Sequence, residues 1–410
     1  MEFTNKVSIN TERLLNRIKE LGGIGMKGTR LAASDADKEG RDKLVNWMRE
    51  AGLDVEIDRI GNVFGIWYGT KNKNEAPILL GSHIDTVINA GRYDGCYGVL
   101  SGLEVINTLQ ETSFVPNRPI AVVAFTNEEG VRYQPDMMGS LVYVGGLSVD
   151  DALKTVGTDN TILGQELERI GYAGTKEPGF LKPHAYIELH IEQGPILDKM
   201  GIPIGAVENL QGISWQRITI EGSANHAGTT PTHMRRDAGL AAARVITKLR
   251  ERANASCERT VATVGTIEFK PNAVNVIPSN ATFTVDLRNP NEQELQEEEQ
   301  ELANYLKELS ASEEVYIKSE QLVRFSPVTF DKTIVKLVEQ VASGRGLPSI
   351  RMTSGAGHDA EMMTSICPAA MIFVPSIDGI SHNPKECTKD TDLVSGAHVL
   401  LDVVMNLAGK

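Results

Sequence analysis

Residues 78–95, ILLGSHIDTVINAGRYDG, begin with an apolar run and go on to an imidazole and two carboxylates, His83, Asp85 and Asp94. A short, uninterrupted apolar run bounded by turn residues is typical of a central strand that is covered on both faces, as in α/β sheets. Active sites of open parallel sheets lie at the carboxyl ends of the strands. The stretch therefore predicts a buried strand that brings three polar side chains to a functional site.

Further apolar runs with polar residues at their ends occur along the chain. PIAVVAFT (119–126) is followed by Glu128 and Glu129, AYIELHIEQG (185–194) carries His190, and AAMIFVP (369–375) is followed by His382. Between two of the runs, GVLSGLEVINTLQE (98–111) has the apolar spacing of a helix. We therefore expect an α/β domain with a mixed central sheet flanked by helices.

The pattern changes near residue 211. Strand and helix signals then follow in the order strand, helix, strand, strand, helix, strand, from GISWQRITIEG (212–222) to EVYIKSE (314–320), with TVATVGTIEF (260–269) read as one strand. This order fits a small α+β sandwich. A chain of 410 residues exceeds the usual size of one core. We predict a split catalytic domain, residues 1–210 and 329–410, interrupted by an inserted domain, residues 211–328.

Composition excludes several classes of protein. A net charge of −13 would repel a phosphate backbone, so nucleic acid is not an expected partner. The N-terminus has no apolar signal region, and the longest apolar stretch, near AAMIFV, is far shorter than the ~20 residues of a membrane span. Cys96, Cys257, Cys367 and Cys387 lack CxxC spacing, which suits a reduced compartment. We expect a cytoplasmic protein without a membrane partner.

The residue types at the strand ends indicate metal chemistry. Imidazole and carboxylate are ligands that zinc and manganese accept, and two cations ~3.5 to 4 Å apart need a shared carboxylate, for which Asp94 is the candidate. The HxD spacing lets the Asp85 carboxylate accept a proton from the far nitrogen of His83. Of Glu128 and Glu129, one can bind metal while the other acts as a base. Each residue alone also fits a purely structural role, but all of these roles would have to hold together.

Short motifs follow one another through nearly the whole chain: GSHIDTV, YDG, NEEG, ELHIEQGP, NHAGTTP, RRDA, NAVNVIP, DLR, SGAGHDA and GISHNP. As an ordered set they resemble the dinuclear-metal amidohydrolases related to aminoacylases and carboxypeptidases. Within that family they resemble the N-carbamoyl-L-amino acid hydrolases and the allantoate amidohydrolases. No single motif would carry the resemblance.

The resemblance implies a role for several residues of the larger domain. It implies two divalent cations, which could be zinc, manganese, cobalt or nickel, and Glu128 matches the general base. Gln193 and His358 are placed near the site. The implied ligands are His83 and His190 for one cation, Glu129 and His382 for the other, and Asp94 as the bridge.

The resemblance also implies that the inserted domain is a lid and a dimer interface. Arg288, helped by Asn275, would bind the substrate carboxylate, and His226 would polarise the scissile carbonyl in the partner subunit of a homodimer. From the residues alone, Arg288 could equally pair with Asp286 or Asp237 at the surface, and His226 could cap a turn. The glycines of SGAGHDA fit a close approach to a ligand or a plain tight turn.

The function that the resemblance implies is hydrolysis of a linear C–N bond in a small anionic ureido compound. For an N-carbamoyl-L-amino acid the products are the L-amino acid, carbon dioxide and ammonia, and an allantoate amidohydrolase, which releases ureidoglycine, is the near alternative. An aminoacylase or dipeptidase usually carries an acidic ligand in place of His190. A catalytically silent binding protein would have lost ligands or the base. A Ser/His/Asp hydrolase that uses Ser82 or Ser354 lacks the G-x-S-x-G elbow.

Overall fold

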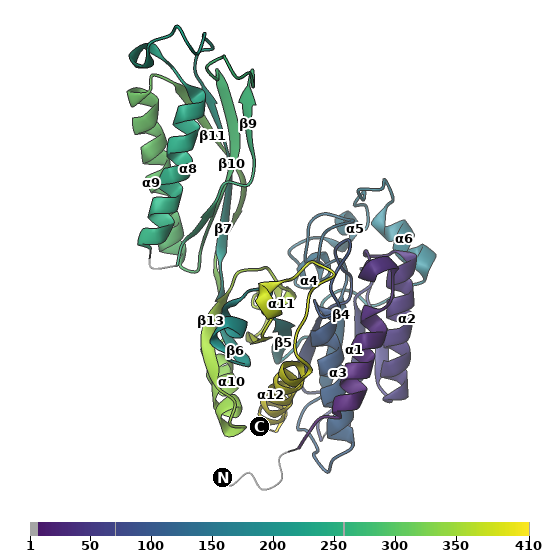
Figure 1. The fold of residues 1–410 in the computed structure, drawn as a ribbon. Coiled ribbons are helices and arrows are strands. Elements are labelled where there is room, and N and C mark those ends of the chain that lie inside the picture. Colours follow the sequence, from purple (N-terminus) through teal and green to yellow (C-terminus); the bar gives the residue numbers. More distant parts are fainter. Residues whose placement is uncertain (1–6, 70, 257–258, 410) are drawn as a thin grey trace. The chain divides into compact units, whose positions relative to one another are not determined.

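The computed structural model describes residues 7–69, 71–256 and 259–409. The chain divides into two compact units, residues 1–208 with 330–410, and residues 209–329 (Figure 1). Among the cysteines, Cys257 lies outside the described residues, and Cys96, Cys367 and Cys387 are free thiols.

The larger unit is built from both ends of the chain. Its helices are α1 (Thr11–Gly22), α2 (Asp35–Glu50), α3 (Cys96–Gln110), α4 (Met138–Tyr143), α5 (Val149–Ala152), α6 (Leu163–Ile170), α7 (Ile196–Met200), α10 (Lys332–Gly344), α11 (Asp359–Met363) and α12 (Asp390–Ala408). Its sheet contains β1 (Asp54–Ile57), β2 (Val63–Trp67), β3 (Ile78–His83), β4 (Ile120–Phe125), β5 (Ala185–Ile191), β6 (Ile204–Leu210), β13 (Ser349–Ser354) and β14 (Ala369–Val374). The last two residues of β6 and the short strand β12 (Val328–Thr329), which pairs with β6, fall within residues 209–329, where the chain passes from one unit to the other.

The sheet has a parallel centre and antiparallel flanks. The strand order is β1-β2-β4-β3-β5-β14-β6-β12, and β13 also pairs with β6. The neighbours β4, β3, β5 and β14 run parallel to one another, whereas β1 pairs antiparallel with β2, β2 with β4, β6 with β14 and β12 with β6. All four parallel strands are buried over their whole length, as continuous apolar runs require. The carboxyl ends of these four strands therefore lie at one edge.

Helices cover the sheet. α3 packs against β3, β4 and β5, α2 packs against β1 and β2, and α12 packs against β14, α3 and α10. By length and composition α12 is apolar enough to span a membrane, a property that the sequence analysis does not predict. Half of its most apolar window is buried within the unit, and Leu393, Leu400 and Val404 are among its buried residues. A buried core helix passes the same test of length and composition.

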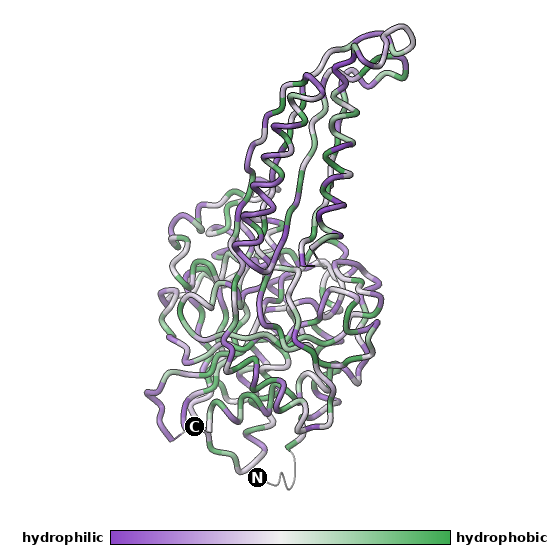
Figure 2. Tube along the Cα trace, turned by 90° about the vertical axis from the view of Figure 1, so that its left-hand side faces the viewer, coloured by the Kyte–Doolittle hydropathy of each residue, from purple (hydrophilic) through white to green (hydrophobic). Residues whose placement is uncertain are grey.

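The smaller unit is an antiparallel sheet with two helices on one face (Figure 1). The strand order is β11-β7-β10-β8, and β9 also pairs with β10. Buried residues from α8, α9 and the inner face of the sheet, among them Ile218, Val245, Phe283 and Leu306, form one core. The two helices alternate hydrophilic and hydrophobic residues along the chain (Figure 2), as helices with one buried face do. The elements are β7 (Gly212–Glu221), α8 (Ala238–Ala255), β8 (Val261–Thr263), β9 (Ile267–Lys270), β10 (Asn280–Asn289), α9 (Glu292–Ser312) and β11 (Tyr316–Phe325).

The predicted fold class, a mixed sheet flanked by helices with an α+β sandwich inserted, is confirmed. One strand prediction is wrong, because residues 260–269 form two short strands, β8 and β9, instead of one. β8 pairs with Asp286–Arg288 and β9 pairs with Asn280–Phe283. Between them Thr266 leaves the ladder and its carbonyl accepts from the N–H of Thr284, so the register breaks at this point.

Candidate active site

The four parallel strands bring most of the predicted site residues to one edge. His83 is the last residue of β3 and His190 is the last but one of β5. Glu128 and Glu129 follow β4, and His382 lies in the segment between β14 and α12. Asp94 lies just before α3, in the loop that leaves β3. The close packing of this loop on His83 depends on Gly95, because a Cβ there would lie 2.5 Å from ring atoms of His83.

Asp94 lies at the centre of this edge and faces three histidines. Its Oδ1 lies 3.6 Å from Nε2 of His83 and 3.2 Å from Nε2 of His190, and its Oδ2 lies 3.1 Å from Nε2 of His382. Gln193 donates to the same Oδ2 at 2.9 Å. The two oxygens of one carboxylate thus face two different sets of donor atoms.

The inner histidines are held so that one nitrogen of each points at Asp94. His83 donates from Nδ1 to the main-chain oxygen of Asp85 at 2.9 Å, and His190 donates from Nδ1 to that of Ile191, also at 2.9 Å. The main-chain N–H of Gly95 donates to Nε2 of His190 at 3.1 Å, so this nitrogen offers a lone pair. Both rings are nearly fully buried. A histidine ligand typically has its ring fixed in this way, with one nitrogen bonded to the main chain and the other directed at the metal position.

The adjacent glutamates lie on the other side of Asp94. Glu129 Oε2 is 3.4 Å from Nε2 of His382, and Glu128 Oε2 is 3.3 Å from Nε2 of His83. Glu129 Oε1 is buried and has no hydrogen-bond partner among the described residues. An orphaned buried carboxylate oxygen is costly unless a cation or a donor satisfies it.

These residues fit divalent cations. Two groups have donor atoms within 4.8 Å of one another, His83 with Asp94 and His190, and Asp94 with Glu129 and His382. They share Asp94, and each combines imidazole with carboxylate, the donor set of zinc and manganese sites. A third group, Glu188, His190 and His358, meets the same distance test. Glu188 already accepts from Ser82 at 2.7 Å and from the N–H of Ala360 at 2.8 Å, so it offers no comparable site.

The electrostatics of the site also suit a cation. Burial raises the pKa of Asp94, but its close contacts with the three histidines outweigh burial and hold that pKa well below its usual value. The contact with Asp94 raises the pKa of His382 to about 9. Burial, aided by the charge of Asp94, raises the pKa of Glu129 to about 8. The site thus holds protons where a cation would sit, and cation binding should release them.

The pKa of Glu128 is also perturbed. Burial raises its pKa well above the usual value; His83 opposes this shift, and the nearby carboxylates Asp359 and Glu129 add to it. Glu128 lies outside both Asp94-sharing donor groups although it contacts His83. A carboxyl group next to ligands, with a perturbed pKa and no ligand position of its own, is suited to proton transfer.

Asp85 does not make the predicted contact. The Asp85 main-chain oxygen accepts from His83, while its carboxylate accepts from the N–H groups of Glu128 and Glu129 at 3.1 and 3.2 Å. The carboxylate Oδ1 lies 3.9 Å from Nδ1 of His83. Asp85 therefore orients both neighbours, His83 through its main chain and the glutamate turn through its side chain. The HxD spacing could not reveal this, because the turn after β4 is distant in sequence.

A pocket of about 170 Å³ opens onto this edge. Gln193 and His358, both predicted near the site, line it together with Asp94, Glu128, Glu129 and His382. The ring of His358 lies 4.5 Å from that of His190, and burial holds its pKa well below the usual value. The sequence analysis did not identify four further lining residues, Asp136, Met137, Ala356 and Gly357. Only the glycines of SGAGHDA hinted at the last two.

Non-glycine residues in the turns after β4, β5 and β14 adopt left-handed backbone conformations. Asn127, Gln193 and His382 have φ values of 57°, 57° and 53°. Such conformations cost free energy, on the order of 1–3 kcal/mol each, and are concentrated at functional sites. In each case the turn follows a parallel strand and directs a side chain of the site. Asn and His are enriched in the left-handed region, whereas local sequence preference does not predict it for Gln193.

The remaining predicted residues lie in the smaller unit. His226 and Val276 form an isolated bridge, and the N–H of Ala227 donates to the carbonyl of Asn275 at 3.0 Å, so His226 and Asn275 lie in neighbouring loops. His226 is exposed, and its Nδ1 accepts from the N–H of Gly228 at 3.0 Å. Arg288 on β10 donates to Asp286, with Nη2 at 2.9 Å from Oδ2. The surface pair that the sequence left open for Arg288 is thus present.

Comparison with known proteins now adds to this geometry. The model of peptidase family M20/M25/M40 matches residues 79–406. The chain belongs to this family. The match includes all the residues of the larger unit that are described above as parts of the site. Together with the donor groups, membership of the M20 family indicates binding of divalent metal.

Individual relatives narrow the comparison within the M20 family. The chain is 37% identical to an N-carbamoyl-L-amino acid amidohydrolase of Geobacillus stearothermophilus over 417 residues, covering 98% of this chain and 99% of that protein. It is 35% identical to an allantoate amidohydrolase of Bacillus subtilis (strain 168) over 363 residues, covering 88% of each. A crystal structure from Burkholderia multivorans, an amidase of the hydantoinase/carbamoylase family, is 40% identical with a TM-score of 0.96 and covers 99% of this chain and 100% of that one. The predicted family resemblance is confirmed.

Proposed function

We propose that this chain is a metal-dependent amidohydrolase that cleaves the carbamoyl C–N bond of N-carbamoyl-L-amino acids. The observation that carries the proposal is the shared carboxylate: Asp94 presents one oxygen to His83 and His190 and the other to His382, with Glu128 beside them. The relative from Geobacillus stearothermophilus supports the substrate class. The products would be the L-amino acid, carbon dioxide and ammonia.

The ligands that we propose for two divalent cations are His83 and His190 for one, Glu129 and His382 for the other, and Asp94 for both. Divalent cations bound there would polarise the scissile carbonyl, acidify the attacking water and lower the pKa of Glu128. The donor set accepts zinc, manganese, cobalt or nickel.

Glu128 is the proposed proton carrier. As a carboxylate it takes a proton from the attacking water, and as a carboxylic acid it gives that proton to the leaving nitrogen. Its burial keeps the pKa of the carboxyl group high, which favours return of the proton within the same turnover. Asp85 holds Glu128 in place by accepting from its main-chain N–H.

We further propose that the smaller unit completes the site. Arg288, with Asn275, would bind the substrate carboxylate, and Arg288 would then exchange its pairing with Asp286 for a forked contact with the ligand. His226 would polarise the scissile carbonyl of the partner subunit in a homodimer. Its Nδ1 accepts from Gly228, which leaves Nε2 as the nitrogen that donates.

Allantoate is the second candidate substrate, because it is also a carboxylate that bears ureido groups and the Bacillus subtilis relative carries that name. Against an aminoacylase or dipeptidase stands His190, where those enzymes usually have an acidic ligand. A silent binding protein would not need the full set of donors around Asp94. The cysteines that the structure describes are free thiols, which supports a location in the reduced cytoplasm.

The proposal is tested by supplying manganese and a panel of N-carbamoyl-L-amino acids, allantoate, N-acetyl amino acids and dipeptides. We expect ammonia and free L-amino acid in equal amounts from the carbamoyl compounds, loss of activity with a chelator, and recovery on adding metal. Preferred turnover of allantoate would assign the second candidate. Full activity in a verified metal-free sample would overturn the metal dependence.

A further inference from the structure

Glu386 is a buried carboxylate that no step above uses. It is 6% exposed, and it makes no ion pair with Lys or Arg among the described residues. Its Oε1 accepts from the main-chain N–H of Tyr93 at 2.9 Å and lies 3.4 Å from that of Asp94. Its Oε2 accepts from the hydroxyl of Ser381 at 2.9 Å. Burying a carboxylate without a cationic partner is costly, so we expect a role of Glu386 that offsets this cost.

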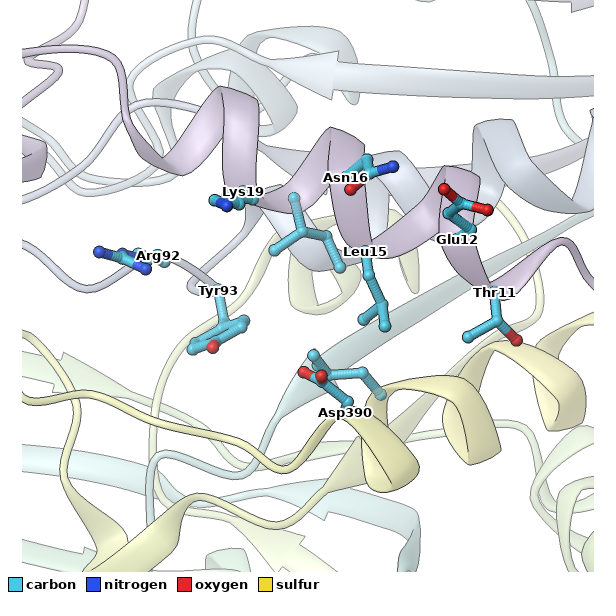
Figure 3. Close-up of a pocket in the computed structure, with 10 residues that line it drawn as sticks. Thr11, Glu12, Leu15, Asn16, Lys19, Arg92, Tyr93 and Asp390 are labelled. Atoms are coloured by element: carbon cyan, nitrogen blue, oxygen red, sulfur yellow. The ribbon is translucent and has the colours of Figure 1, made fainter.

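These contacts join two loops that the sheet keeps apart. The loop with Tyr93 and Asp94 leaves β3, the segment with Ser381 and His382 follows β14, and β5 lies between the two strands. Gly91 allows the close approach, because a Cβ there would lie 2.0 Å from Oε1 of Glu386. The side chains of Arg92 and Tyr93 line a separate surface pocket of about 600 Å³ between α1 and α12 (Figure 3). The carboxylate thus holds the main chain of a loop whose neighbouring side chains face that pocket.

The hydroxyl of Ser381 lies within hydrogen-bond distance of two carboxylates. Ser381 Oγ lies 2.9 Å from Oε2 of Glu386 and 3.3 Å from Oδ2 of Asp94. A serine hydroxyl has a single hydrogen, so it can donate to only one of them, and Glu386 is the nearer. While Ser381 donates to Glu386, Asp94 Oδ2 accepts only from Gln193 and keeps its other lone pair for the side on which Glu129 and His382 lie.

We propose that Glu386 is a positioning residue for the Asp94–Glu129–His382 cation site: it ties the loop of Asp94 to the segment of His382 and keeps the Ser381 hydroxyl from Asp94. The inference rests on the proposed metal dependence and adds a residue to it. In Glu386→Gln the amide oxygen still accepts from Tyr93, but the amide nitrogen donates to Ser381. Ser381 then donates to Asp94 and competes with the cation for Oδ2.

The test is a titration of the metal-free full-length chain with Mn²⁺, in which free Mn²⁺ is followed by electron paramagnetic resonance. Changes in residues that orient metal ligands typically cost about 10- to 100-fold in affinity. We expect a loss of that size in Glu386→Gln for one of two bound Mn²⁺ ions, with the other little affected. Ser381→Ala should keep both ions, and the double variant Ser381→Ala/Glu386→Gln should recover much of the lost affinity because the competing hydroxyl is gone.

Asp58→Asn is the matched control. Asp58 is also buried and accepts from two main-chain N–H groups, those of Ile60 and Asn62, but it touches no proposed ligand. We expect this variant to keep both Mn²⁺ affinities even if it unfolds at lower temperature. Equal affinities in Glu386→Gln and wild type, or equal losses in Glu386→Gln and Asp58→Asn, would overturn the role of Glu386. If Glu386→Gln does not fold, a loss of Mn²⁺ in Ser381→Ala would overturn it. A wild-type chain that binds neither Mn²⁺ nor, in parallel titrations, Zn²⁺, Co²⁺ or Ni²⁺ would overturn the metal dependence itself.

Discussion

At the scale of single residues, the proposed mechanism gives Asp94 and Glu128 different tasks, cation binding and proton transfer. Asp94 has a pKa held well below its usual value, so it stays a carboxylate whenever the histidines face it. Glu128 has a raised pKa and lies outside the two donor groups that share Asp94. Two carboxyl groups whose environments shift their pKa values in opposite directions are suited to different tasks, one to binding cations and one to moving protons.

Changing Glu128 to Gln tests this division. The amide keeps the shape of the side chain but cannot carry the proton, so kcat should fall at least about 100-fold while KM and cation content stay near wild type. Steady-state kinetics and metal analysis of the purified variant check it. Glu129→Gln is the matched control and should lose bound metal. If Glu128→Gln loses metal together with activity, Glu128 is a ligand and Glu129 becomes the candidate base.

At the scale of elements, four parallel strands with buried, apolar bodies and polar ends account for most of the site. β3 and β5 place His83 and His190 directly, because both histidines belong to the strands. Glu128, Glu129 and His382 depend on turns after β4 and β14, and these turns include residues in the left-handed region. The strands are stabilised by burial, whereas the turns are held by contacts such as those of Asp85 and Glu386.

Helix α12 carries a pH dependence that is separate from catalysis. Burial, with the charge of Arg345, lowers the pKa of His398 to about 4, and its Nε2 is buried without a partner among the described residues. Since the unfolded chain binds this proton near pH 6.5 and the folded chain does not, His398 should reduce stability as the pH falls from about 6.5 to 4. The ceiling is about 1.4 kcal/mol per pH unit, and partial exposure of the ring makes the loss smaller.

His398→Leu removes this titration. Chemical unfolding at several pH values should show that the variant loses less stability than the wild type between pH 6.5 and 4. His233→Leu, a change at an exposed histidine of the smaller unit, is the control and should follow the wild type. Parallel stability curves for wild type and His398→Leu would contradict the expected charging of His398.

At the scale of the whole molecule, the proposed function needs both units. The donors around Asp94 belong to the larger unit, while Arg288, Asn275 and His226 belong to the smaller one. If His226 acts on the partner subunit, an isolated subunit has no complete site. A two-fold dimer with such shared sites has a simple complementation pattern.

Mixing two inactive variants, His226→Ala and Glu128→Gln, tests the shared site. In a mixed dimer the subunit with the His226→Ala change keeps its own Glu128 and receives His226 from its partner, so one site works. Random exchange makes about half of the dimers mixed, so roughly a quarter of wild-type activity should return. Subunit exchange is verified with differently tagged chains. Continued inactivity after verified exchange would show that His226 acts within its own chain or has another role.

The sequence by itself determined the fold class and the residues that gather around Asp94. Short continuous apolar runs bounded by turn residues favour buried strands of a covered sheet, and polar residues at the carboxyl ends of parallel strands meet at one edge, so local pattern indicated where the site lies. The resemblance of the motifs to a known family then named the ligand candidates, and the structure brings them together in two donor groups: His83, Asp94 and His190, and Asp94, Glu129 and His382.

Only the tertiary structure decided which atoms meet. The Asp85 carboxylate turned to the N–H groups after β4 instead of to His83, and the strand expected at 260–269 split where its partner β10 could pair with each half. Glu386 acquired its contact with Tyr93 across 293 positions of sequence. Such hydrogen bonds form only when the donor–acceptor distance is right to within a few tenths of an ångström. Because the two segments share no local sequence pattern, only tertiary packing sets that distance.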